Sequence, residues 1–147
     1  MASWTKICCP IDFSETSRAA LEEASELAQR YQAELVLLHV FEPPVATADL
    51  MVAPPEMFEQ TARELERKLD LWRSEVERRG AKAVRSRVVT GAAATEVVRF
   101  AREGGYDLVV MGTHGRRGLR HLVLGSVAER VVREAPCAVL VVRPRPR

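Results

Sequence analysis

The sequence predicts an α/β fold in which helices cover both faces of a parallel sheet, and three observations lead to it. Segments with strand character alternate strictly with segments of helical period along the 147 residues. Two strand segments are nearly unbroken apolar runs, as in strands buried on both faces: ELVLLHVF at 34–41 and DLVVM at 107–111. A last apolar strand, CAVLVV, is expected at 137–142. Because parallel strands need helical crossovers, this order of elements indicates one open parallel sheet.

The first strand and the first helix are expected before residue 32. Residues 4–11 are short, apolar and β-prone, and they form the first strand. Ser14 can cap the helix that follows, because its hydroxyl can accept a hydrogen bond from a free N–H of the first turn. Apolar residues at steps of four, three and four form the buried face of that helix: Ala20, Ala24, Leu27 and Tyr31.

The middle of the chain contains a proline-rich loop and the longest helix. Two Pro-Pro pairs frame residues 43–55, which predicts a surface loop. From 56 to 79 the apolar residues alternate steps of four and three, and Gly80 is placed to end this helix. Its surface is expected to carry three ion pairs at a spacing of four residues: Glu59–Arg63, Glu64–Lys68 and Glu75–Arg79.

The second half of the chain completes the alternation. Residues 82–89 alternate charged and apolar side chains, as in an edge strand with one exposed side. A helix is expected over 93–103 before the strand at 107–111, and another over 126–135 before the strand at 137–142. The chain is therefore interpreted as a single domain over 1–147, with 143–147 as a flexible tail.

Charge and composition exclude several classes of protein. Lys and Arg number 22 and Asp and Glu 20, and this net charge of +2 is too small for a surface that coats nucleic acid. No apolar run approaches the roughly 20 residues of a membrane-spanning helix, and no signal-peptide pattern is present. We therefore expect a cytoplasmic protein with neither nucleic acid nor membrane as a partner. Cys8, Cys9 and Cys137 lack zinc-ligand spacing and are interpreted as buried reduced thiols.

A basic, glycine-bearing loop follows the strand at 107–111. It contains Gly112, Gly115 and Gly125 followed by Ser126, in the spacing G-x₂-G-x₉-G-S, with three arginines and no acid between. Glycine lets a backbone approach an anion closely, and a helix that starts at Ser126 points its free N–H groups towards it. These features indicate a phosphate site, although the spacing is neither that of a P-loop nor that of a dinucleotide-binding turn.

Structural interpretations of the same residues stay open. Ser126 to Glu129 has the pattern of a capping box, in which Ser126 need only accept a hydrogen bond from the Glu129 N–H. Asp12 could cap the first helix instead of facing a ligand. His39 lies in an apolar strand and is interpreted as a core or pocket-wall residue, because a lone histidine lacks the partners that a metal ion needs.

The loop and its surroundings resemble the universal stress protein family. Its glycine spacing after DLVVMGTHGR is similar to the nucleotide-binding signature of that family, and so are KICCPIDFSETSRAAL, ELVLLHV and VLGSVAERVVREAPCAVLVVR, which together cover essentially the whole chain. The resemblance implies a single five-stranded parallel sheet of order 3-2-1-4-5, of the adenine-nucleotide alpha-hydrolase-like type. It also implies a homodimer and ATP binding, with Mg or Mn held by the phosphates.

The resemblance further implies which residues bind the nucleotide. Asp12 would face the nucleoside, and Val40 would contact adenine through its backbone. The same pocket would be lined by Pro10, Ile11 and Met111. Ribose and phosphates would be surrounded by Gly112, Gly115, Gly125, Ser126 and the N–H of Val127. The implied order places the first and fourth strands side by side, so Asp12 and Gly112 meet where an open α/β sheet binds its ligand.

These observations favour a nucleotide-dependent stress-response switch over an enzyme. A hydrolase needs a group that activates water and carboxylates that hold a metal ion on the phosphates, and Asp12 is the acid that the sequence places at this edge. We expect little or no hydrolysis, no catalytic residue and no metal ligand from the chain. One alternative is a stress-response interaction protein that binds no nucleotide. Another is a nucleotide-activating transferase, whose histidine or serine-glycine motifs after the first strand are missing.

A homodimer is also indicated by the last strand. Residues 137–142 form an apolar strand at the end of the chain, and an exposed edge of this kind must be covered or paired. An isologous pair across this strand, in which both copies use the same surface, is the expected arrangement.

Overall fold

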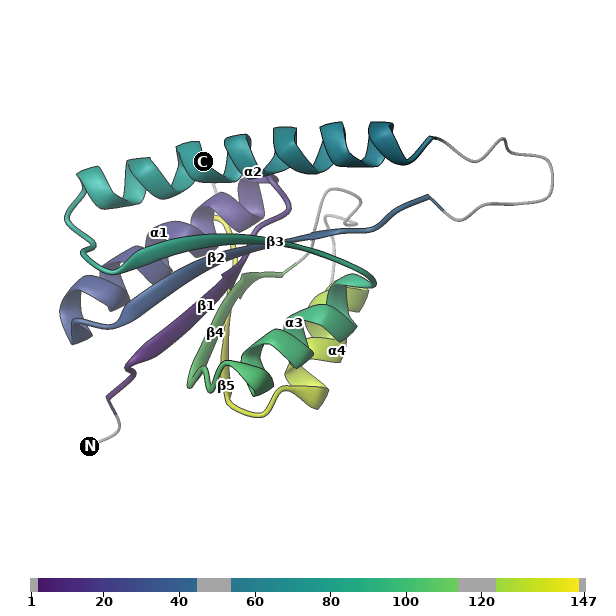
Figure 1. Cartoon of the computed structure of the whole chain (residues 1–147). Helices are drawn as coiled ribbons and strands as arrows, with labels where there is room; N and C mark the ends of the chain where they lie inside the picture. The colour runs from purple at the N-terminus through teal and green to yellow at the C-terminus, as the bar shows by residue number, and fades with distance from the viewer. Residues whose placement is uncertain (1–2, 45–53, 114–123, 146–147) are drawn as a thin grey trace.

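Five parallel strands form the centre of the computed structural model, which describes residues 3–44, 54–113 and 124–145. The strands are β1 (Lys6–Pro10), β2 (Glu34–Phe41), β3 (Val84–Thr90), β4 (Leu108–Gly112) and β5 (Ala138–Val142). They lie in the order β3-β2-β1-β4-β5, and every neighbouring pair is parallel (Figure 1). The predicted parallel sheet and its order 3-2-1-4-5 are confirmed.

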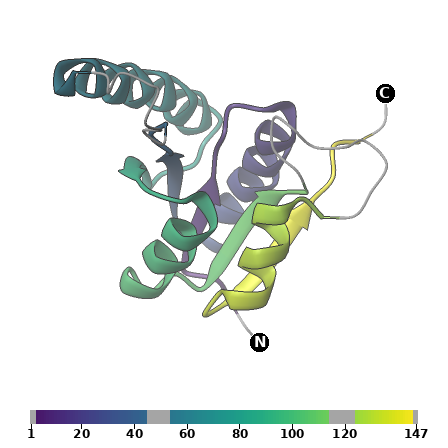
Figure 2. The same cartoon turned by 90° about the vertical axis from the view of Figure 1, so that its right-hand side faces the viewer.

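Two helices cover each face of this sheet. The helices are α1 (Glu15–Tyr31), α2 (Pro55–Arg78), α3 (Ala93–Glu103) and α4 (Ser126–Glu134). The views in Figures 1 and 2 show α1 and α2 on one side of the strands and α3 and α4 on the other. All four lie within one or two residues of their predicted bounds.

Alternating side chains of the central strands supply the two halves of the core. Leu35 and Leu37 of β2 pack with α1 and α2, whereas Val36 and Leu38 pack with α3 and α4. Each of these four side chains is at most 2% exposed. The continuous apolar run of this strand is thus explained by helices on both faces.

The surface of α2 differs from the predicted ion-pair pattern. Glu75 pairs with Arg18 of α1 at 3.0 Å, not with Arg79 as predicted. Arg73 pairs with Asp70 and Glu77 on the same helix. The contact between Arg18 and Glu75 ties α1 to α2, which a rule about spacing within one helix does not anticipate.

The cysteines agree largely with their interpretation as reduced core thiols. All three are free, and Cys8 and Cys9 are fully buried, whereas Cys137 is only half-buried. Burial raises the pKa of the Cys8 and Cys9 thiols well above the ordinary value, so both stay protonated at neutral pH. Across the described ranges, no helix combines the length and the apolar character needed to cross a membrane.

Candidate functional site

The winding of the sheet reverses between β1 and β4. From β1 the chain winds outward to β2 and β3, and it then returns to place β4 and β5 on the other side of β1. β1 and β4 pair directly, with Ile7 opposite Leu108 and Cys8 opposite Val109. Ligands of open α/β sheets bind beyond the carboxyl ends of the strands at such a position. We call residues 10–12 and 111–113, which follow or end these two strands, the switch point.

Four apolar residues predicted for the site lie at or beside the switch point, but they face different ways. Val40 and Met111 pack with the α3 and α4 side of the core, and Met111 is 5% exposed. Ile11 packs with the α1 and α2 side, while its N–H donates to the Leu38 carbonyl at 2.8 Å. Pro10 ends β1 and is half-buried. The structure therefore groups Val40 with Met111 and directs the Ile11 side chain to the opposite face.

Asp12 lies in a tight turn that leads into α1. Its Oδ1 accepts hydrogen bonds from the Ser14 N–H, at 2.9 Å, and from the Ser14 hydroxyl. Ser14 is the N-cap of α1, as predicted, and its Oγ accepts from the Ser17 N–H at 3.2 Å. Asp12 thus orients the capping serine and does not cap the helix itself.

Gly112 ends β4 directly against the first turn of α1. A Cβ on Gly112 would lie 2.9 Å from the Thr16 Cβ and 3.0 Å from the Thr16 carbonyl carbon and oxygen. Side chains do not tolerate such contacts, so this position needs a glycine for helix packing, whatever it binds. The close approach also brings α1 to the switch point.

The start of α4 is fixed beside the end of β4. The Thr113 N–H donates to the Val142 carbonyl at 3.1 Å, and the Gly125 N–H donates to the Thr113 carbonyl at 2.6 Å. The bond to Thr113 therefore places Gly125 and Ser126, at the start of α4, next to the switch point.

The capping box expected as an alternative at Ser126 is wrong. Gly125 is the N-cap of α4 and has no side chain to cap it, and Ser126 is the first residue inside the helix. The Glu129 N–H bonds instead to the Gly125 carbonyl at 2.9 Å. Ser126 and Val127 are exposed in this first turn. An N-terminus of this kind has backbone N–H groups and a positive dipole end available for an anion.

Part of the predicted loop lies outside the described residues. This applies to Gly115, to the arginines at 116, 117 and 120, and to the histidines at 114 and 121. Within the described ranges, His, Cys, Asp and Glu side chains form no group of three or more that could hold a metal ion.

Sequence reasoning missed Glu42, which follows β2 at the same end of the sheet. Its Oε1 accepts from the Ala93 N–H at 2.6 Å, at the start of α3, where the N-cap residue Ala92 has no capping side chain. The acid thus occupies the N-terminus of α3, whereas among the described residues no side chain is recorded as a cap for α4. A glutamate just after a strand carries no sequence signal for such a long-range cap.

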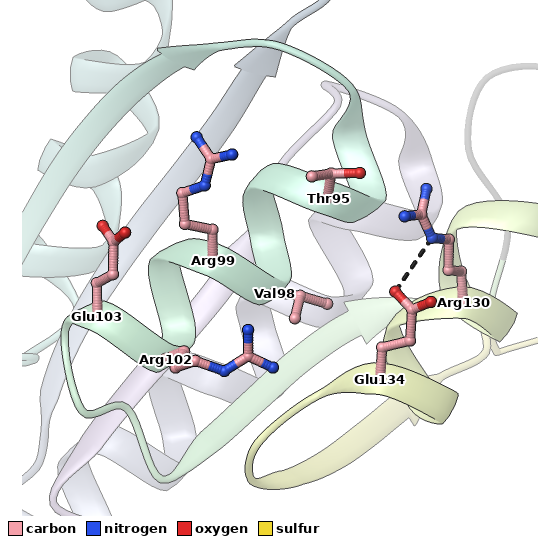
Figure 3. Close-up of a pocket in the computed structure, with 7 residues that line it drawn as sticks. All are labelled: Thr95, Val98, Arg99, Arg102, Glu103, Arg130 and Glu134. Atoms are coloured by element: carbon pink, nitrogen blue, oxygen red, sulfur yellow. Dashed lines mark hydrogen bonds and ion pairs between the residues drawn. The ribbon is translucent and has the colours of Figure 1, made fainter.

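A separate cleft of about 560 Å³ lies between α3 and α4 (Figure 3). It is lined by Thr95, Val98, Arg99, Arg102, Glu103, Arg130 and Glu134. Arg130 pairs with Glu134 at 3.1 Å, and Arg99 pairs with Glu96 at 3.2 Å. Two of its three guanidinium groups thus already have carboxylate partners. The cleft contains none of the predicted site residues.

Comparisons with known proteins agree on one family. A sequence profile of the Universal stress protein family matches residues 3–143. Universal stress protein MJ0531 of Methanocaldococcus jannaschii is 33% identical over 95% of this chain and 82% of its own length. Universal stress protein YxiE of Bacillus subtilis is 32% identical over 95% of this chain and 99% of its own.

Solved structures show the same fold. Universal stress protein UspA from Lactobacillus plantarum has a TM-score of 0.84 at 27% identity, covering 97% of this chain and all of that one. A universal stress protein in complex with cAMP has a TM-score of 0.72 at 23% identity, over 98% of this chain and 100% of that one. One from Archaeoglobus fulgidus in complex with dAMP has a TM-score of 0.69 at 20% identity, over 95% and 98%.

Proposed function

The chain belongs to the universal stress protein family, and on that premise we propose that it is a cytoplasmic protein that binds ATP or a related adenine nucleotide at the switch point. In this proposal the bound nucleotide acts as a stress-response signal and is hydrolysed slowly or not at all. Asp12 faces the nucleoside, Val40 and Met111 line the base, and the start of α4 receives the phosphates.

The observation that carries the proposal is the position of the α4 N-terminus, whose N-cap Gly125 has no capping side chain. Hydrogen bonds through Thr113 hold Gly125 beside the end of β4, and the pairing of β1 with β4 brings Asp12 to the same edge of the sheet. A carboxylate that can accept from ribose hydroxyls thus lies on one side of the switch point. Backbone donors that can bind phosphate lie on the other side. This pairing of groups suits a nucleotide.

The fold of this chain also occurs with adenine nucleotides bound. Two universal stress proteins of the same fold were solved in complex with cAMP and with dAMP. These complexes support an adenine nucleotide as the class of ligand. A triphosphate is favoured here by the glycine spacing of the loop and by its three arginines, which add positive charge for the phosphates.

Slow hydrolysis follows from the groups available at the switch point. A Mg or Mn ion would be held by the phosphates, because the described residues form no cluster of carboxylates for it. The Asp12 Oδ1 already accepts from Ser14, and dedicated NTPases use additional carboxylates for the metal ion and the attacking water. We expect a turnover number below the usual enzyme range of about 1–10³ s⁻¹.

A thermal melt of nucleotide-stripped protein with and without Mg-ATP tests the proposal. ATP at about 100 times its Kd adds roughly 2.7 kcal/mol to the free energy of unfolding, which raises the Tm of a chain of this size by about 5–10 °C. Gly115→Val and Ser126→Ala should lose this shift. Ser86→Ala, on the far edge strand β3, is the matched control and should keep it.

The alternatives predict different results in the same assay. A melt that ATP does not shift supports an interaction protein that binds no nucleotide. Release of pyrophosphate from ATP with a candidate acid substrate supports the transferase.

We propose in addition that the protein is a homodimer through β5. This strand is one edge of the sheet, and its Leu140 is 38% exposed. An apolar edge strand of this kind is a template for pairing with a second copy. Analytical ultracentrifugation at micromolar concentration should give a dimer, and Leu140→Lys should give a monomer. A monomer from the unaltered chain contradicts the proposal.

A further inference from the structure

Phe13 has an unusual backbone conformation for a large side chain. Its φ is 66°, in the left-handed region that residues other than glycine rarely adopt. Strain of this kind persists where the surroundings enforce it, and it gathers at binding sites and switch elements. Phe13 lies between Asp12 and Ser14, directly after the switch-point residues 10–12. What enforces its conformation is therefore a question about the site.

The ring of Phe13 is held by three side chains from β2 and α2. Its centroid lies 4.9 Å from that of His39 and 5.3 Å from that of Trp72, and the Lys68 ammonium lies 4.4 Å from it. We call these four residues the Phe13 cluster. The edge-to-face contact with Trp72, at 86°, and the cation above the ring are both favourable geometries. Packing against α2 thus stabilises the strained turn.

The conformation of Phe13 determines where the Asp12 carboxylate lies. Asp12 Oδ1 accepts from the N–H of the residue two positions on, Ser14, so the hydrogen bond spans Phe13. Because this hydrogen bond closes a local turn around Phe13, a change in the Phe13 backbone conformation moves Asp12 relative to Ser14. His39 supports the same turn, with its Nδ1 2.7 Å from the Ile11 carbonyl oxygen.

Trp72 connects this turn to the outer surface of α2. The Arg18 guanidinium lies 4.0 Å from the centroid of the Trp72 ring and pairs with Glu75 at 3.0 Å. Trp72 is therefore packed between Phe13 and Arg18, and it is 8% exposed. A shift of the Phe13 ring has to move Trp72 or break these contacts.

The end of β4, on the other side of the switch point, also contacts the first turn of α1. Gly112 lies against Thr16, and the Thr16 hydroxyl is 2.9 Å from the Ser14 hydroxyl, which bonds to Asp12. A ligand that touches both strand ends therefore acts on the first turn of α1 from both sides.

We propose that Phe13 is a positioning residue that orients Asp12 for the nucleoside and transmits nucleotide binding to α2 through Trp72. This inference rests on the proposed function and names the element that responds to it. α2 is the responding helix because it contributes Lys68 and Trp72 to the Phe13 cluster.

Trp72 fluorescence provides the direct measurement. The chain has two tryptophans, and Trp4 packs edge-to-face against Tyr31, with the ring centroids 5.3 Å apart, near the opposite end of β1. Trp4→Phe therefore leaves Trp72 as the single reporter without touching the site. Titration of this variant with Mg-ATP should change the Trp72 emission along the same curve as binding measured by calorimetry.

Two substitutions at Phe13 separate positioning from transmission. Phe13→Val should weaken ATP binding about tenfold, because a β-branched residue resists the left-handed conformation and misplaces Asp12. Phe13→Gly should weaken binding less, because glycine accepts this conformation, but it should abolish the Trp72 response. Phe100→Leu is the matched control, since Phe100 stacks on Tyr106 under the other face. It should lower the Tm and leave both ATP affinity and Trp72 response unchanged.

The outcomes distinguish this inference from the proposed function. Binding of ATP to the unaltered chain with no change in Trp72 emission overturns the inference alone. So does a folded Phe13→Val variant that keeps its ATP affinity. If Phe13→Val does not fold, a Trp72 response that persists in Phe13→Gly overturns the transmission. Absence of ATP binding by calorimetry to the unaltered chain overturns the proposed function, and the inference falls with it.

Discussion

The two ends of the sheet each hold an aspartate next to a strand, and the two carboxylates are bound in different ways. Asp107, at the amino end before β4, accepts from the Thr5 N–H at 2.9 Å, the Thr5 hydroxyl at 2.8 Å and the Lys6 N–H at 3.1 Å. Asp12, at the carboxyl end after β1, accepts from Ser14, two residues further along. One aspartate joins segments a hundred residues apart, whereas the other organises a local turn.

The residues around Asp107 also make long-range contacts, whereas those around Asp12 form a local turn and a close helix contact. At the amino end, the Lys6 ammonium donates to the Gly104 carbonyl and lies 4.7 Å from the centroid of Tyr106, which stacks on Phe100. At the carboxyl end, Phe13 is strained and Gly112 is pressed against α1. The amino end is thus closed by long-range contacts, and its left-handed residue Gln32, with a φ of 54°, is the C-cap of α1 and lies away from Asp107 in sequence. At the carboxyl end the left-handed residue is a phenylalanine directly beside Asp12, and strain next to a candidate ligand group is typical of binding sites.

Tyr106→Ala should have the largest effect on stability. The ring is 7% exposed and packs against Phe100 and Lys6, so its removal leaves a cavity and should cost about 3–5 kcal/mol of unfolding free energy. Urea denaturation measures this loss, and Tyr106→Phe, which keeps the ring, is the control. ATP affinity should not change, because the amino end is remote from the switch point. A weakened ATP affinity in a folded Tyr106→Ala variant would break the division between the two ends.

Gly112→Ala should cost less stability but should affect the ligand. The added Cβ would lie 2.9–3.0 Å from Thr16, which forces β4 and α1 apart at a cost of about 1–3 kcal/mol. Since this movement opens the switch point, calorimetry should show weaker ATP binding as well. A variant that loses stability but binds ATP as before would show that packing alone accounts for this glycine.

Much of the fold could be predicted because its signals are local. The run at 34–41 and the helix at 93–103 were bounded correctly, since an unbroken apolar run and a helical period with closing glycines each lie within one segment. Ser14 was identified as a cap for the same reason. Local patterns of this kind depend on the element itself and not on what packs against it.

The site depended more on contacts between distant segments. Glu75 pairs with Arg18 because α1 packs beside α2, which a pattern within one helix does not reveal. Ile11 and Met111 lie on opposite faces of the sheet, because the direction of each side chain depends on its position along its own strand. Ser126 lies one residue inside α4, which turns a capping pattern into an open helix end. The left-handed conformation of Phe13 could not be predicted, because it depends on contacts with Trp72 and Lys68 of α2, which are far away in the sequence.

Asp107→Asn should cost less stability than Tyr106→Ala or Gly112→Ala, and its effect should depend on pH. Partial burial acts to raise the pKa of Asp107, but the hydrogen bonds from Thr5 and Lys6 outweigh it and hold the pKa below the ordinary value. A lowered pKa in the folded state stabilises the fold above the unfolded-state pKa of about 3.9, and this contribution is lost as the pH falls through the folded-state value. Asparagine keeps the shape without the charge, and should cost about 1 kcal/mol near neutral pH.

The pH series and a matched aspartate sharpen the comparison between the two ends. The stability difference between the unaltered chain and Asp107→Asn should shrink as the pH falls through the lowered folded-state pKa of Asp107, because its carboxyl then becomes neutral. Asp12→Asn is the same substitution at the carboxyl end, and its amide oxygen can still accept from Ser14. It should change the urea midpoint at neutral pH less than Asp107→Asn does, yet weaken ATP binding more. If both variants lose stability equally and bind ATP equally, the two aspartates do not differ in role, and the division into a structural amino end and a ligand-binding carboxyl end is wrong.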